Sequence, residues 1–366
     1  MDFVPLIDAV GESSAFALIG LTLGMLFGAT AERTGFCTRS AVLELSRGKR
    51  GHMLPLWLLA FATTVLATQL LIVTGQIDVL ESRFFGTAQS LSGAAVGGAL
   101  FGAGMVLTRG CASRLLVLGA SGNLRALFSI AIIAVMAWAT FQGPLVPLRN
   151  AVAAQLMSSD FGSNDLAVVT GTGANAGLIA GVALAVLAIA FATFRRLAVR
   201  HVIGGLAIGA LIPAGWYLIY QFSLQVFEPI QPESLSYMRP LANTVNFVAS
   251  GGDEAFVSFD IGLIGGTFAG ALVASLLFRS FRIHTFADQR APRWPRYALG
   301  SVLMGFGGIL SVGCTIGAGF TGGAVLAFSS LTALLFMILS AAVTDRLVDR
   351  RGGLATVSGG FAAPAE

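Results

Sequence analysis

The chain has 366 residues, of which 55% are hydrophobic and 11% charged, and its mean hydropathy is +0.83. Soluble globular domains carry about 25% charged residues, so this composition excludes a soluble globule and indicates an integral membrane protein. The formal net charge is only +4, and the basic residues form no pattern typical of nucleic-acid binding, so we expect no nucleic-acid partner.

Nine apolar stretches are long enough to cross a bilayer as helices, which takes about 20 residues. The segment before the first stretch contains no Lys or Arg, so it lacks the basic region of a cleaved signal peptide, and we expect the first helix to stay. The sequence therefore predicts an all-α integral membrane protein with a single transmembrane domain over residues 1–366. The nine stretches cover residues 13–32, 53–75, 90–109, 122–142, 174–194, 201–222, 258–278, 296–312 and 324–344.

The distribution of basic residues predicts how these helices are oriented. The connections after the first, third, fifth, seventh and ninth helices hold 19 of the 22 Lys and Arg residues, and the N-terminus and the other connections hold 3. Positive charge favours the cytoplasmic side of a membrane. We therefore expect the N-terminus outside, the C-terminus in the cytoplasm, and contact between the basic side and anionic membrane lipids.

Two glycine-rich segments match each other at a constant offset of 203: GGALFGAGMVLTRGC at 97–111 and GSVLMGFGGILSVGC at 300–314. A weaker match relates GLTLGMLFGA at 20–29 to GLAIGALIPA at 205–214. Because matched helices are five spans apart, an odd number, the two halves must point in opposite directions across the membrane, which is an inverted-topology repeat. The expected divisions are a first repeat at 13–142, a linker with the fifth helix at 143–200, a second repeat at 201–345 and a short cytoplasmic tail at 346–366.

Each of the three cysteines follows a glycine by one or two residues and precedes a short apolar run, as in GFCTRS at Cys37, RGCASR at Cys111 and VGCTIG at Cys314. Runs of about 8 to 10 residues cannot cross the bilayer, so we predict broken helices that restart as half-helices. Glycine permits the turn, and the restart exposes N–H groups that favour anions. In the second half, the region corresponding to Cys37, around PAGWYL, has no cysteine.

The cysteines and the polar residues beside them are the predicted substrate pathway. Two other interpretations stay open: glycines and cysteines also suit close helix packing, and arginines on the basic side also reach lipid headgroups. Outside, we expect Arg83, Arg149 and Arg239 to capture an anion if folding gathers them at one mouth. The predicted pathway residues are Cys37, Cys111, Cys314, Gly35, Gly110, Gly313, Thr38, Ser113, Thr315, Arg39, Arg109 and Arg114.

The sequence contains no Cys-x-x-Cys motif and no cluster of residues with metal-ligand spacing, so we expect neither a metal nor another cofactor. The three histidines fall in connections on the predicted cytoplasmic side. Acidic residues are absent from the centres of the predicted spans, and Glu44 and Asp260, near span ends, come closest. This pattern does not favour the buried carboxylate relay of a proton-driven pump.

The motifs GFCTRS, RGC and VGCTIGAG, spread over a nine-helix chain with an inverted repeat, resemble the YeeE/YedE family of sulfur-compound transporters. The resemblance implies a bacterial inner-membrane protein that is not an enzyme. It would take up thiosulfate or a related small sulfur anion, with Cys37, Cys111 and Cys314 as transient thiol binding steps. It also implies a cytoplasmic TusA-like or rhodanese-like sulfurtransferase as partner. Two alternatives stay open: a membrane sulfurtransferase-like protein that carries sulfur or selenium as a cysteine persulfide, and a scaffold whose cysteines only pack.

Overall fold

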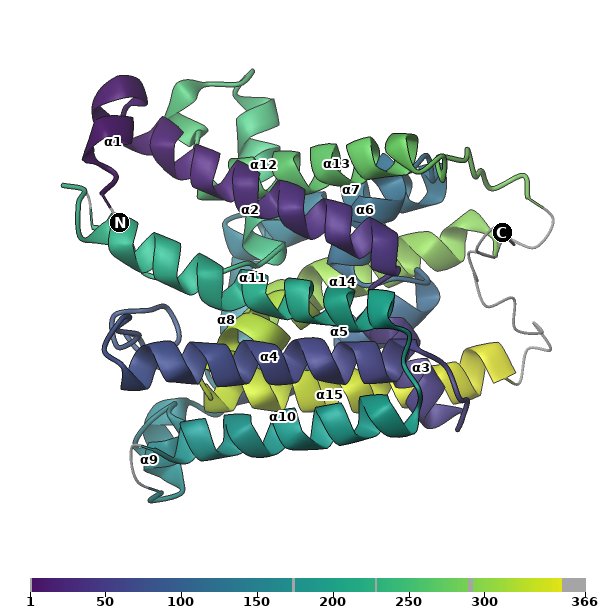
Figure 1. The fold of residues 1–366 in the computed structure, drawn as a ribbon. Helices are drawn as coiled ribbons and strands as arrows, with labels where there is room; N and C mark the ends of the chain where they lie inside the picture. The colour runs from purple at the N-terminus through teal and green to yellow at the C-terminus, as the bar shows by residue number, and fades with distance from the viewer. Residues whose placement is uncertain (1, 173–174, 228, 289–291, 351–366) are drawn as a thin grey trace.

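The computed structural model describes residues 2–172, 175–227, 229–288 and 292–350, which are almost entirely helical (Figure 1). In this part of the chain, nine helices are long and apolar enough to cross a membrane, which confirms an all-α multi-pass membrane protein. The long helices are α2 (Glu12–Thr34), α4 (Met53–Val73), α5 (Leu91–Leu107), α7 (Leu124–Phe141), α10 (Ala176–Phe194), α11 (Val199–Ser223), α13 (Phe259–Leu277), α14 (Trp294–Leu310) and α15 (Phe328–Thr344).

Short helices lie between and beside these spans. Three of them, α3, α6 and η3, continue α2, α5 and α14 after a break, which confirms the predicted half-helices. A fourth, α12, follows a non-helical stretch after α11. The short elements are α1 (Val4–Val10), α3 (Thr38–Ser46), α6 (Ala112–Ala120), α8 (Val146–Ala153), η1 (Ser158–Phe161), α9 (Leu166–Val169), α12 (Met238–Ala249), η2 (Glu254–Phe256), η3 (Thr315–Gly322) and η4 (Asp345–Arg350).

α11 has no break in the region around PAGWYL that the sequence comparison set opposite Cys37. The helix runs unbroken through PAGWYL and contains Pro213 in its interior. The chain leaves the helix only after Ser223 and restarts at Met238, directly after Tyr237. At the offset of 185 between the matched glycines, Cys37 corresponds to Phe222, so the glycine match itself places the counterpart of the Cys37 break at the end of α11.

The parallel helices α2 and α13 are in direct backbone contact through glycines spaced four residues apart. A Cβ atom at Gly24 would lie 2.5 Å from the carbonyl oxygen of Leu263, and one at Gly266 would overlap the carbonyl oxygen of Leu21. Small residues at this spacing allow membrane helices to approach closely. The glycines involved are Gly20, Gly24 and Gly28 on α2 and Gly262, Gly266 and Gly270 on α13.

The two matched glycine-rich helices, α5 and α14, pack against each other in a reciprocal manner. A Cβ atom at Gly97 would lie 2.6 Å from the carbonyl oxygen of Gly307, and one at Gly104 would lie 2.5 Å from that of Gly300. The sequence comparison matched Gly97 with Gly300 and Gly104 with Gly307, so exchanging each glycine for its match turns the contact Gly97–Gly307 into the contact Gly300–Gly104. A two-fold relation between the helices has this consequence. The inverted repeat and its boundaries stay predictions.

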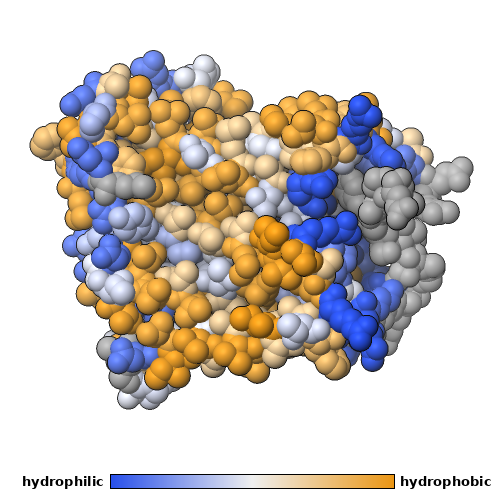
Figure 2. Space-filling model, in the orientation of Figure 1, coloured by the Kyte–Doolittle hydropathy of each residue, from blue (hydrophilic) through white to orange (hydrophobic). Residues whose placement is uncertain are grey.

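The surface has an apolar middle and polar ends (Figure 2). Large apolar side chains are exposed along the spans, and those of α10 such as Ile179 and Leu187 are exposed by 67% and 66%. Such side chains suit contact with lipid tails. We call the end of the molecule that holds α3, η4 and the segment 279–288 the basic end, because the connections there are rich in arginine (Figure 1). The other end, which holds α8, α9 and η2, is the opposite end.

The arginine distribution generates a topology prediction. We expect a reporter fused after residue 366 to be active on the cytoplasmic side, because the positively charged end stays inside. A reporter inserted between Gly251 and Gly252, an exposed turn at the opposite end, should report the exterior. Cell fractions assayed for both reporters would measure this. A C-terminal reporter that is active outside would contradict the orientation.

The contact between α2 and α13 generates a prediction with an adjacent control. Gly266→Ala should lower the unfolding temperature of the detergent-solubilised protein, because its Cβ would meet the backbone of α2, and overpacking typically costs about 1–3 kcal/mol. Gly265→Ala should leave it unchanged or raise it, because open space surrounds that position and alanine favours helix. Equal effects of the two substitutions would argue against direct backbone contact.

Candidate functional site

The three breaks that end in cysteine share one backbone conformation. Two residues before each cysteine, the chain takes a left-handed φ angle: 68° at Gly35, 63° at Arg109 and 64° at Val312. The cysteine itself is extended and precedes the first residue of α3, α6 or η3. The sequence predicted that glycine would provide each turn, and this holds for Gly35 at the first break and in part at the third, where Gly313 has a φ of 155°. At the other two breaks, non-glycine residues adopt a conformation that costs about 1–3 kcal/mol.

The glycines next to Cys111 and Cys314 have another role, because they leave room for the half-helices. A Cβ atom at Gly313 would lie 2.7 Å from the backbone nitrogen of Ala318 in η3. One at Gly110 would lie 3.1 Å from a methyl carbon of Leu115 in α6. Both glycines therefore permit the chain to fold tightly over the start of the following half-helix.

All three thiols are buried, with exposed fractions of 4% for Cys37 and 0% for Cys111 and Cys314. The side chains of Cys37 and Cys111 lie next to each other, although they are 74 residues apart in the sequence. The backbone N–H of Gly317 donates to the sulfur of Cys314 at 3.5 Å, and this residue is three positions after the cysteine. The amides of Ser40 and Arg114, also three positions on, lie next to the other two thiols.

Tyr237 joins the cysteines, and the sequence analysis missed it. This side chain is fully buried, lies near both Cys111 and Cys314, and shares a 3.0 Å hydrogen bond with the hydroxyl of Thr267. It ends a buried, non-helical segment at residues 232–237. The polar sequence of this segment, PESLSY, is typical of a surface loop, so its burial was not evident from the sequence. Its backbone is partly satisfied inside the protein, because Thr321 donates to the carbonyl of Leu235 at 2.6 Å.

The predicted hydroxyl groups lie at the breaks, with different partners. The indole nitrogen of Trp57 donates to the hydroxyl of Thr38 at 3.1 Å, and the hydroxyl of Ser113 is 3.5 Å from the sulfur of Cys111. The hydroxyl oxygens of Thr315 and Ser236 are buried and have no hydrogen-bond partner among the described residues. These two hydroxyls are therefore available to a bound ion.

Two of the three predicted outer arginines come together at the opposite end. Glu233 pairs with both, at 3.3 Å from the Nε of Arg83 and in close contact with Arg239. Asp260 pairs with Arg239 at 3.1 Å and accepts a 2.6 Å hydrogen bond from Asn243. Partial burial opposes the charge of Arg239, yet Asp260 and Glu233 together raise its pKa above the ordinary value. The two cations thus face two carboxylates, so this mouth attracts anions only weakly.

Arg149 does not join this pair. Its guanidinium donates to the side chain of the neighbouring Asn150 at 3.0 Å and to the carbonyl of Phe141 at 3.0 Å. Arg83, in contrast, pairs with Glu233 and lies within electrostatic range of the thiol of Cys314. Folding therefore brings Arg83 and Arg239 together around Glu233 and leaves Arg149 apart.

At the basic end, the predicted pathway arginines sit near Cys37. Arg114 is 3.8 Å from the carboxylate of Glu32 in α2 and donates to the carbonyl of Ala31 at 3.1 Å. Arg39 pairs with Asp349 at 3.3 Å. The charges of Arg39 and Arg114 both act on the thiol of Cys37. Lipid headgroups are therefore not needed to explain these two arginines.

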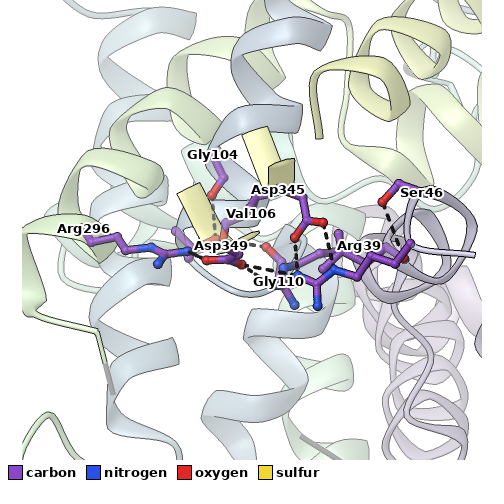
Figure 3. A network of polar contacts seen from close by, with 11 residues as sticks. Arg39, Ser46, Gly104, Val106, Gly110, Arg296, Asp345 and Asp349 are labelled. Carbon is purple, nitrogen blue, oxygen red and sulfur yellow. Dashed lines mark hydrogen bonds and ion pairs between the residues drawn. The ribbon is translucent and has the colours of Figure 1, made fainter. Parts of the chain in front are cut away.

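The end of the described chain ties several elements together there (Figure 3). Asp349 lies between Arg39 of α3 and Arg296 of α14, which it contacts at 2.7 Å. Asp345 makes a close ion pair with Arg47, whose pKa it raises through a hydrogen bond. Three arginines thus surround two buried aspartates, and the network connects η4 with the start of the first half-helix.

Comparison with known proteins identifies the family of this chain and two relatives that cover most of it. A family model described as Sulphur transport matches residues 33–343, which include all three breaks. The chain belongs to this family, the YeeE/YedE family. It is 25% identical over 363 residues to the thiosulfate transporter TsuA of Escherichia coli, with 93% of this chain and 98% of the relative covered. It is 27% identical over 360 residues to the thiosulfate transporter TsuA of Spirochaeta thermophila, with 87% and 95% covered.

For this YeeE/YedE protein, the carboxylates around the arginines were the residues that sequence reasoning missed. Glu32 and Glu233 are buried partners of Arg114 and Arg83, and they stand far from them in the sequence. Asp260 belongs to the outer mouth, whereas Glu44 accepts hydrogen bonds from the first backbone amides of α4. The described residues contain no group of three metal-ligating side chains. Acidic residues near the ends of spans, such as Glu32 and Asp260, were the signal in the sequence that could have indicated these ion pairs.

The Asp349 network generates a stability prediction. Asp349→Asn should lower the unfolding temperature of the purified YeeE/YedE protein, because Arg39 and Arg296 would lose their charged partner, and a hydrogen bond to a charged group contributes about 1.5–3 kcal/mol. The exposed Asp8 provides the control, since Asp8→Asn should change the unfolding temperature little. An unchanged value for Asp349→Asn would show that the network does not hold η4 in place.

Proposed function

We propose that this protein takes up thiosulfate, or a related small inorganic sulfur anion, across the bacterial inner membrane, and that it is a transporter and not an enzyme. Membership in the sulphur transport family supports this proposal. Two relatives that span nearly the whole chain are named thiosulfate transporters. The observation that carries the proposal is the approach of the thiols of Cys37 and Cys111, at the centre of a set of helix breaks that also includes Cys314.

A dianion that crosses this protein must replace its water shell with other donors. Burial of an unpaired charge is very costly, so donors are needed at each step. The breaks offer backbone N–H groups at the starts of α3, α6 and η3, where the helix dipole also favours negative charge. Neutral thiols add weak S–H donors that suit a soft terminal sulfur and release it easily. Three such steps would make binding possible without making it too tight.

The charges at the two ends suggest the route. An ion would enter at the mouth formed by Arg83 and Arg239, and Arg83 lies near Cys314. It would then pass Cys111 and Cys37 and leave past arginines at the basic end. In this route the two thiols in contact form the central step. The predicted orientation makes this direction inward.

Two further parts of the proposal concern symmetry and partner. The reciprocal packing of α5 on α14 supports an inverted repeat, with residues 13–142 and 201–345 as its halves and 143–200 as the linker.

A cytoplasmic TusA-like or rhodanese-like sulfurtransferase would receive the ion at the basic end. Exposed cations there, including Lys49, Arg50 and Arg282, offer a surface for an acidic partner or for lipid headgroups.

Substitution of the cysteines tests the pathway. Cys111→Ala and Cys314→Ala should each lower uptake of labelled thiosulfate at least tenfold, because each removes one donor from a series of steps. The protein should stay folded, since loss of one small buried group typically costs about 1–3 kcal/mol. Cys→Ser keeps a donor without the soft sulfur, so a partial to severe loss is expected. Uptake into proteoliposomes measures this.

Two controls separate the alternatives. Ser301→Ala removes a buried hydroxyl whose hydrogen bond stays within α14, so uptake should be kept. The intact mass of the protein after turnover should be unchanged. A transient added sulfur atom on Cys111 would instead establish a persulfide carrier, and full uptake by a variant with all three cysteines replaced by alanine would leave the thiols only a packing role.

A further inference from the structure

A cavity of about 100 Å³ lies at the basic end, between the break before α6 and the start of α7. Its polar lining comes from Thr108, Arg109, Asn123, Arg125 and Tyr297. At roughly 30 Å³ per water molecule, the space holds about three waters, which is the scale of an inorganic oxyanion and far below that of a nucleotide. The cavity is separate from the thiols, although Arg109 is only two residues before Cys111.

The two arginines of this cavity have unused hydrogen-bonding capacity. The Nε atoms of Arg109 and Arg125 are buried and have no hydrogen-bond partner among the described residues. Arg125 forms a 3.4 Å ion pair with Asp288, whose side chain is 44% exposed. No carboxylate in the described part of the chain forms an ion pair with Arg109. The cavity therefore has more positive than negative charge and buried donors without acceptors.

The backbone conformation at Arg109 indicates that its side chain is present for a reason other than the turn. The turn requires a left-handed residue, and the equivalent positions hold Gly35 and Val312. Glycine adopts this conformation without strain, so an arginine here is not explained by the turn. Strained residues of this kind cluster at ligand sites.

Other groups in the lining suit an oxyanion. The side-chain oxygen of Asn123 already accepts from the backbone amides of Arg125 and Ala126, so its NH₂ group is left as a donor. The hydroxyl of Thr108, in contrast, already donates to the carbonyl oxygens of Gly104 and Gly110, at 3.0 and 3.1 Å, so it is not counted among the donors of the site. Guanidinium groups offer paired donors that match the oxygens of a tetrahedral anion.

We propose that Arg109, Arg125 and Asn123 form a binding site for a small inorganic oxyanion, which holds the transported sulfur anion on its way out at the basic end. This role rests on the proposed function, since it assumes that such an anion crosses the protein. The site itself requires only the cavity, the charge and the unpaired donors. It would keep an ion that leaves the thiols from returning to them.

A binding experiment tests the site. Sodium sulfate and sodium thiosulfate should raise the unfolding temperature of the purified full chain above that in sodium chloride of equal ionic strength. Arg109→Gly and Arg125→Gln should each weaken sulfate binding at least tenfold. Glycine adopts the left-handed conformation of Arg109 without strain, so Arg109→Gly removes the side chain and keeps the turn. Arg196→Gly is the matched control, because Arg196 is also left-handed (φ 50°) and exposed at the same end. Sulfate binding that is unchanged in both cavity variants would overturn the proposal.

A transport experiment tests the exit role. In proteoliposomes, Arg109→Gly should raise the half-saturating thiosulfate concentration at the basic side at least fivefold and leave that at the opposite side unchanged. Loss of sulfate binding without this one-sided change would overturn the exit role. If the wild-type protein binds sulfate through Arg109 but carries no thiosulfate, the proposed function fails and the site stands. Sulfate binding in Cys111→Ala should persist, and its loss there would place the ion at the thiols and overturn the separate site.

Discussion

The structure depends on one constraint: a helix that breaks at membrane depth leaves backbone N–H and C=O groups without partners, and lipid provides none. The half-helices α3, α6 and η3 and the buried segment 232–237 must therefore be enclosed by protein. The glycine contacts between α2 and α13, and between α5 and α14, make this possible, because they bring whole backbones together without side chains between them. The breaks can exist because the surrounding spans are packed so closely.

The same enclosure explains why the arginines are accompanied by carboxylates. A cation buried without a partner would be costly, and Glu32, Glu233 and Asp349 lie beside one, two and three arginines, respectively. Such pairing also weakens the attraction of each end for an anion. Conduction needs sites that are favourable enough to enter and weak enough to leave. In the proposed pathway, partly neutralised arginines on either side of the thiols would meet both requirements, whereas a fully positive funnel would hold a dianion too tightly.

Hydropathy sufficed to predict the nine spans, because each is a continuous apolar stretch whose length is set by the bilayer. The Gly-Cys pattern predicted the three breaks for a local reason, since a short run cannot cross. The segment 232–237 was beyond such reasoning, because its enclosure depends on distant partners such as Ile212, whose carbonyl accepts from Ser234 at 2.7 Å. The pairing of Arg83 with Glu233 was hidden for the same reason. Contacts between distant residues decide both features, and one sequence does not show them.

The left-handed residues show how firmly the breaks are fixed. Gly35, Arg109 and Val312 adopt nearly the same φ angle, although glycine does so freely and a β-branched valine does so at a cost. Local preference therefore does not produce this conformation, and the packing around each break must impose it. A conformation that three unlike residues share is rigid before any ion arrives. Donors held in place in this way need no rearrangement when an ion arrives, and the proposed pathway relies on this when weak thiol contacts replace the water shell of a small anion.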